Sequence, residues 1–174
     1  MPIKQVLFSL FFFIGILPAA IGQEGPPQTE AEFEKQYQER IKKDKLNGIY
    51  IPKNLDDALL QLDKLIAPES QAKIKKIPED SVCWALHARL GQWIMLNWGF
   101  YGGSRLSFYL RSAGITFPDD MADFILLCYH RRLNAKPYTI KEFAVQFREK
   151  RKEEFENEKK QGKIIHEEVR KKNR

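Results

Sequence analysis

The chain has 174 residues, of which 43% are hydrophobic and 30% charged, and its formal net charge is +6. This length favours a single domain. Residues 141–174 hold twelve Lys or Arg and eight Glu, so this tail carries a charge of +4 and the core before it is close to neutral. A near-neutral core and a tail of mixed sign argue against a nucleic-acid-binding protein.

The first 22 residues have the layout of a secretory signal peptide. Lys4 precedes an almost wholly apolar stretch from Val6 to Ala20, which Pro18 breaks near its end. The small residues Ala20 and Gly22 predict cleavage after Gly22. The alternative is an uncleaved membrane anchor, but a span needs about 20 apolar residues. We therefore expect an exported chain, periplasmic or secreted, with no membrane span in its mature part.

The mature chain divides into three predicted parts. Residues 23–48 comprise a linker and a charged helix that begins with a capping-box pattern of Thr29 and Glu32. Residues 49–138 form the core domain, and residues 139–174 form a charged helical extension. No clear strand alternation is present, so the predicted class is all-α: a compact bundle of short helices around a central apolar helix.

Caps and apolar spacing predict the first helices of the core domain. Asn54 caps a helix whose leucines recur at helical spacing, and Pro68 begins a shorter one. The next helix, from about Ser81 to Asn97, is apolar nearly all round. Such a helix is usually surrounded by others, so we expect it to be the central helix of the domain.

The second half of the core domain follows the same rules. Ser104 caps a helix that ends at Gly114 in the left-handed conformation, and Pro118 begins the next helix. The charged extension begins at Thr139, and we expect Gly162 to interrupt it.

The two cysteines, Cys83 and Cys128, leave two alternatives open. A disulfide between them would close a loop of 46 residues and stabilise the fold by about 4 kcal/mol. Two free, buried thiols are the other alternative, because Cys is among the most buried residue types. Together with His87 and His130 these cysteines have the wrong spacing to converge on one metal ion, so neither a metal nor a cofactor is expected.

An aromatic and glycine-rich connection, Trp98 to Arg105, is a candidate binding site. Its candidate contact residues are Trp98, Tyr101, Ser104 and Arg105. Glycines permit close backbone approach, a helix N-terminus attracts anions, and Arg105 supplies a guanidinium, which together suit an anion or a sugar. The alternative is a tight connection between helices, in which Gly makes the turn and Ser the cap. It is not a phosphate-binding P-loop, because the Gly-Lys-Ser/Thr ending is absent.

Two neighbouring acids, Asp119 and Asp120, complete the candidate site. Adjacent residues on a helix point about 100° apart, so these carboxyl groups do not face each other as a catalytic pair. Their place in a first helical turn, near the positive end of the helix dipole, explains them without catalysis. No nucleophile elbow, zinc-protease helix or nucleotide fingerprint is present.

About half of the chain, Ile49 to Asn134, resembles a bacterial domain family without an assigned function. The residues that carry the resemblance are Ile51 to Ala58, Trp93, Asn97 to Gly99, Gly103 to Leu106, Gly114-Ile115, Pro118 to Met121 and His130-Arg131. The resemblance implies a compact helical domain and no catalytic residue.

Three functions remain open. The first is a non-catalytic module that binds a protein or envelope component through the aromatic-glycine loop, because Trp and Tyr anchor interfaces. The second is an enzyme acting on an envelope polymer, with Asp119, Asp120 or His130 near that loop. The third is an inhibitor or immunity-type partner of a secreted protein.

Overall fold

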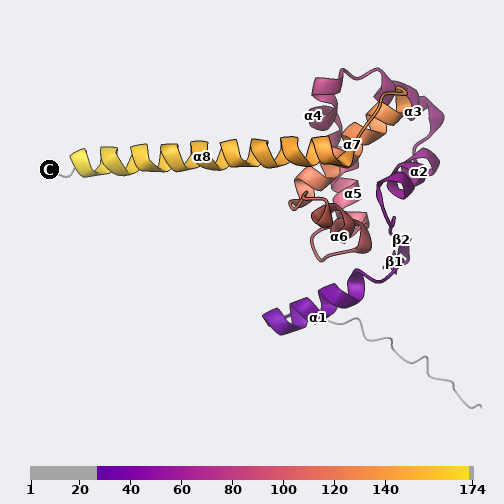
Figure 1. The fold of residues 1–174 in the computed structure, drawn as a ribbon, viewed down its shortest axis with the longest axis horizontal. Helices are drawn as coiled ribbons and strands as arrows, with labels where there is room; N and C mark the ends of the chain where they lie inside the picture. The colour runs from indigo at the N-terminus through magenta and orange to yellow at the C-terminus, as the bar shows by residue number, and fades with distance from the viewer. Residues whose placement is uncertain (1–26, 173–174) are drawn as a thin grey trace, which may run out of the picture.

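The computed structural model describes residues 27–172, with the side chains of residues 27–160. The predicted signal peptide lies outside the described residues. The all-α prediction is confirmed: helices pack into one domain, from which the first and last helices project as two arms (Figure 1). The elements in chain order are α1 (Glu30–Arg40), β1 (Lys45–Leu46), β2 (Ile49–Tyr50), α2 (Leu55–Leu65), α3 (Pro68–Lys75), the 3-10 turn η1 (Glu79–Ser81), α4 (Val82–Leu86), the π-helical segment η2 (His87–Gly91), α5 (Gln92–Asn97), α6 (Arg105–Ser112), α7 (Pro118–Leu133) and α8 (Ile140–Lys172).

A two-stranded hairpin, β1 and β2, separates α1 from the domain. The strands are antiparallel, with Lys45 opposite Tyr50 and Leu46 opposite Ile49. Asn47 and Gly48 form the turn with φ values of 50° and 79°, the left-handed backbone that a two-residue hairpin turn requires. The sequence predicted a turn here but no strands.

The predicted caps of the domain are present. The Asn54 side chain accepts a hydrogen bond from the N–H of Asp57, and Ser104 accepts one from the N–H of Ser107. Gly114 follows α6 with a φ of 95°, as expected for a helix end that needs glycine. These local signals fix where α2 and α6 begin and where α6 ends.

The central helix of the domain is α7, not the predicted helix at Ser81–Asn97. It contacts α2, α3, α4, η2, α5 and α6. Nine of its residues are buried: Asp120, Met121, Ala122, Phe124, Ile125, Leu126, Cys128, Tyr129 and His130. The segment from Val82 to Asn97 instead lies on the surface of the bundle, because Trp84 is 87% exposed and Leu96 is 69% exposed.

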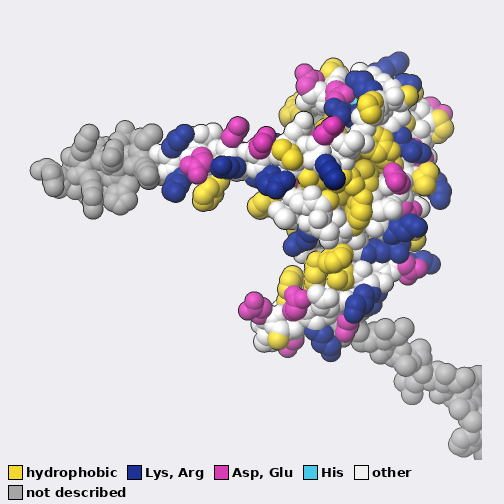
Figure 2. Space-filling view, in the orientation of Figure 1, with side chains coloured by type: hydrophobic (Ala, Val, Ile, Leu, Met, Phe, Trp, Pro, Cys, Tyr) yellow, Lys and Arg dark blue, Asp and Glu magenta, His cyan; other side chains and the backbone are white. Residues whose placement is uncertain are grey.

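The last helix, α8, docks only at its beginning. Phe143 and Ala144 are buried there, and the rings of Phe143 and Phe124 meet edge to face at 5.7 Å. Beyond this root α8 projects away from the domain, with Lys, Arg and Glu interspersed along its shaft (Figure 2). The helix runs unbroken to Lys172, so the predicted interruption at Gly162 is wrong. Within residues 27–172, none of the helices combines the length and the apolar character of a membrane span.

Candidate functional site

The helical segment from Val82 to Asn97, formed by α4, η2 and α5 in succession, has one packed side and one exposed side. Val82, Ile94 and Met95 are buried on the packed side, which contacts α7. The middle of the segment is a π-helical turn from His87 to Gly91. Single π turns inside α-helices occur often at functional sites, so the residues around this turn are candidates for a site.

His87 stands between two acids of α7 at the start of the π turn. Its Nδ1 lies 2.7 Å from an Asp123 carboxylate oxygen, and its Nε2 lies 3.4 Å from an Asp119 carboxylate oxygen. The two acids therefore contact opposite edges of the imidazole ring and cannot share one metal ion with it. Across residues 27–160, no group of three or more His, Cys, Asp or Glu side chains is placed to hold a metal.

Cys83 lies one turn before His87, but its thiol is not activated. The Cys83 Sγ donates to the carbonyl oxygen of Asp123 at 3.7 Å. Burial, together with the nearby Asp123 charge, raises the pKa of Cys83 to about 11. Burial also raises the pKa of Cys128. Both cysteines are free in the structure, and thiols with raised pKa values are poor nucleophiles at neutral pH.

The exposed side of the 82–97 segment is mostly apolar, with Arg89 and Gln92 as its polar residues. Trp84 is 87% exposed and Leu96 is 69% exposed, and the exposed residues between them include Ala85 and Ala88. The segment contains no Asp or Glu, and its one exposed charge is Arg89. We call Trp84, Ala85, Ala88 and Leu96 the apolar stripe. An exposed Trp flanked by small residues is typical of a surface that binds another protein.

The aromatic-glycine loop is built mainly as a structural connection. Trp98 is 1% exposed and packs edge to face on Trp93, with ring centroids 5.9 Å apart. Ser104 is buried and forms a capping box with Ser107. Tyr101 is 60% exposed, and its hydroxyl donates to the Met95 sulfur at 3.6 Å. Of these candidate residues, Tyr101 alone presents most of its side chain to solvent.

Arg105 joins the loop to the hairpin. Its Nε donates to the carbonyl oxygen of Ile51 at 2.7 Å, and its guanidinium lies over the Tyr50 ring at 5.0 Å. The Tyr50 hydroxyl in turn donates to Asp57 at 2.8 Å. Arg105 therefore holds the start of the domain against α6, which the sequence did not reveal because its partners are a carbonyl and a ring 54 and 55 residues away.

The two neighbouring acids, Asp119 and Asp120, have different roles in the structure. Asp119 is 54% exposed and faces His87. Asp120 is buried and forms an ion pair with Arg151 of α8. As expected from their spacing, the two carboxyl groups do not form a catalytic pair.

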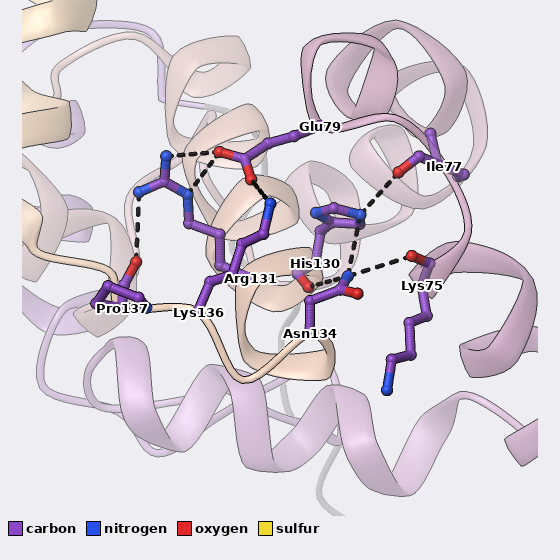
Figure 3. Close-up of polar contacts among 8 residues, drawn as sticks. All are labelled: Lys75, Ile77, Glu79, His130, Arg131, Asn134, Lys136 and Pro137. Carbon is purple, nitrogen blue, oxygen red and sulfur yellow. Dashed lines mark hydrogen bonds and ion pairs between the residues drawn. The ribbon is translucent and has the colours of Figure 1, made fainter.

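His130 lies at the other end of α7 in a polar cluster that closes the domain (Figure 3). It is 2% exposed, and its Nε2 lies 2.9 Å from the carbonyl oxygen of Ile77. Beside it, Arg131 donates twice to one oxygen of Glu79, and Lys136 donates to the other oxygen. Ten helical residues separate His130 from Asp120, which is about 15 Å along the axis. His130 therefore lies away from Asp119 and Asp120, and these three candidate residues do not meet at one place on α7.

These features describe a small all-α domain with a partly buried polar cluster at one end of α7 and a mostly apolar exposed stripe. Residues 51–133 match the family model described as "Domain of unknown function (DUF6794)". This match confirms the resemblance to a domain family without an assigned activity. No curated protein and no solved structure gives a significant match to the chain.

Proposed function

We propose that this chain is an exported, non-catalytic module that binds a protein partner in the cell envelope through the apolar stripe. The observation that carries the proposal is Trp84, a large aromatic side chain left 87% exposed on a well-packed domain. Exposed Trp residues are costly to hydrate and are enriched among the side chains that dominate binding energy.

The geometry around the described titratable groups supports binding over catalysis. His87 has its two ring nitrogens facing acids, Cys83 has a raised pKa, and His130 is buried against Ile77. A general base needs a free nitrogen or oxygen within reach of a substrate.

The chemistry of the stripe indicates the kind of partner. Leu96 and Trp84 lie twelve residues apart, about 18 Å along a helix, and the exposed residues between them are two alanines, Arg89 and Gln92. This arrangement suits a partner helix that lies lengthwise on the surface and buries the Trp ring. Because Arg89 is the exposed charge of the segment, we expect an acidic residue at the partner's edge.

Export rests on the signal-like sequence of the first 22 residues. The pattern of Lys4, an apolar stretch and small residues before the cleavage position supports a periplasmic or secreted location. An anchor that is never cleaved is the alternative, and it would keep the domain at the same side of the membrane.

A crosslinked pull-down of the mature chain, Gln23 to Arg174, from its own cell envelope tests this function. We expect one dominant protein that is lost with Trp84→Ala and Leu96→Ala. Leu65→Ala is the matched control, because Leu65 is 57% exposed on α2 and lies outside the stripe. Recovery of the same proteins with Trp84→Ala would contradict the proposal. Trp98 is unsuitable for this test, since its replacement would damage the core.

The alternative of an enzyme acting on an envelope polymer now depends on His87 and Asp119. They are the histidine and the partly exposed acid that the structure brings together. A loss of polymer cleavage with His87→Gln, with the fold retained, would support it. If the chain is instead an inhibitor or immunity-type partner, the same pull-down should capture a protein that is itself an active toxin or hydrolase.

A further inference from the structure

The aromatic-glycine loop is contacted by α1, which lies outside the matched family segment. Arg40 Nε donates to the carbonyl oxygen of Gly103 at 3.0 Å. Hydrophobic side chains gather at the junction between α1 and the domain (Figure 2). The loop surface is thus occupied by a helix of the same chain.

Three glycines of the loop leave room for this contact because they have no Cβ atom. A Cβ on Gly103, whose φ is 85°, would overlap the ring of Tyr37. A Cβ on Gly102 would lie 3.2 to 3.3 Å from the guanidinium of Arg40, and one on Gly99 would lie 3.1 Å from its Nη2. We call Gly99, Gly102 and Gly103 the glycine surface. Its bare backbone fits an aromatic ring and a guanidinium that lie one helical turn apart.

The helix that fills this surface is otherwise weakly held. No residue of α1 is buried, and Phe33, which stacks on Tyr37 at 6.4 Å, is 46% exposed. An isolated helix of this length is marginal in water, so α1 depends on its contact with the domain. A segment held by so few buried groups opens readily by local unfolding.

We propose that the glycine surface is a second protein-binding site, for a helical segment that carries an aromatic residue and an arginine three positions later. In the resting chain α1 occupies this site through Tyr37 and Arg40, and a partner segment of the same chemistry displaces it. This inference rests on the proposed role as a binding module and adds a site that the apolar stripe does not include.

The test uses the full mature chain with the site vacated by Tyr37→Ala and Arg40→Ala. The probe is a fluorescent, end-capped peptide, Gln28–Lys42, which is α1 supplied in trans. We expect the double variant to bind the peptide at least about tenfold more tightly than the wild type, because a tethered helix competes at an effective concentration near millimolar. A peptide that carries the same two replacements must not bind.

Two controls separate occupation of the site from damage to the fold. Gln38 lies on α1 with its side chain exposed. The Gln38→Ala variant should therefore bind the peptide as weakly as the wild type does. Thermal unfolding of the double variant should stay close to that of the wild type, because α1 has no buried residue. Hydrogen exchange in residues 30–40 should rise in the double variant and not in Gln38→Ala.

Equal peptide binding to the vacated and wild-type chains would overturn the inference, and so would a lack of binding to the vacated chain at millimolar peptide. Either result leaves the Trp84-dependent pull-down unchanged, so failure of this site and failure of the proposed function are distinguishable. A partner that is captured better by the vacated chain than by the wild type would support both.

Discussion

Arg151 and Asp120 form a two-point ion pair that joins the last helix to the central one. The Arg151 Nε and Nη2 each lie 2.8 Å from a different oxygen of the Asp120 carboxylate. The Arg151 guanidinium also lies over the Phe117 ring at 4.9 Å. Because the Asp120 side chain is only 6% exposed, removal of its partner leaves a desolvated charge.

Replacement of Arg151 by Ala should therefore destabilise the domain by about 2–3 kcal/mol, somewhat less than a fully buried pair because Arg151 is 37% exposed. Urea unfolding of the purified chain measures this difference. Glu154→Gln is the control, since its contact with Arg151 is at the surface and should change the stability by less than about 0.5 kcal/mol. Equal effects of the two replacements would show that the Asp120 pair has no special weight.

Two of the three tryptophans of the 82–98 region, Trp84 and Trp98, should respond in opposite ways. Trp98→Ala removes a core side chain and should cost about 3–5 kcal/mol. Trp84→Ala removes an exposed side chain and should change the free energy of unfolding by less than about 0.5 kcal/mol. Chemical denaturation of both variants checks this contrast. A large loss with Trp84→Ala would mean that its ring is covered within the chain and is not a binding surface.

The cluster around Glu79 predicts part of the acid sensitivity of the fold. Hydrogen bonds from Lys136 and Arg131 lower the pKa of Glu79 below its usual 4.5. A lowered folded-state pKa gives stability that is fully present above the unfolded value and is lost as the pH falls through the folded value. Between pH 5 and pH 3, the wild type should therefore lose about 1 kcal/mol more than Glu79→Gln, as judged by urea unfolding at each pH. Parallel pH curves for the two chains would refute this role.

Alkaline pH should weaken the fold through acidic groups whose pKa values are raised by burial, among them Cys83, Cys128 and Tyr129. Burial raises the pKa of Cys83 to about 11 and that of Tyr129 to about 12. A raised folded-state pKa gives stability that is complete below the unfolded value and declines as the pH rises toward the folded value. The free energy of unfolding should fall from about pH 9 upward, and Cys83→Ala should reduce the part of the fall below pH 11. A flat profile to pH 10.5 would be inconsistent with buried thiols.

The state of the cysteines has a direct measurement. Thiol titration of the unfolded, unreduced chain should find two free thiols, as in the structure. The native chain should react slowly, because the pKa values of Cys83 and Cys128 are both raised. A mass about 2 Da lower and no titratable thiol would instead establish the disulfide, with its expected stabilisation of about 4 kcal/mol.

Local signals predicted much of the fold, and long-range contacts explain what they missed. The caps at Asn54 and Ser104 depend on hydrogen bonds three residues away, so the sequence predicted them. The central helix was assigned wrongly because an apolar sequence does not show which of its side chains are packed against other helices. Trp84 and Leu96 are apolar but exposed. The Asn47-Gly48 pair is a strong hairpin signal, yet two-residue strands are too short to show alternation.

The candidate site was only partly accessible to sequence reasoning. The glycines of the loop were identified as a place of close approach, but Tyr37 as its neighbour lies 66 residues from Gly103. Arg105 was expected to offer its guanidinium to a ligand, but its Nε donates to a backbone carbonyl oxygen that no side-chain pattern encodes. The exposure of an aromatic residue such as Trp84 can be recognised only when the residues packed around it are known.

The Arg151 anchor has a further consequence because α8 is one continuous helix from Ile140 to Lys172. Each residue of an α-helix advances the direction of its side chain by about 100°. The ion pair therefore fixes how the part of α8 beyond Arg151 is rotated about the helix axis relative to the domain. One residue inserted just after Arg151 would rotate residues 152–160 by about 100° around the helix axis without moving the anchor, whereas eleven inserted residues would restore the original direction and lengthen the helix by about 16 Å.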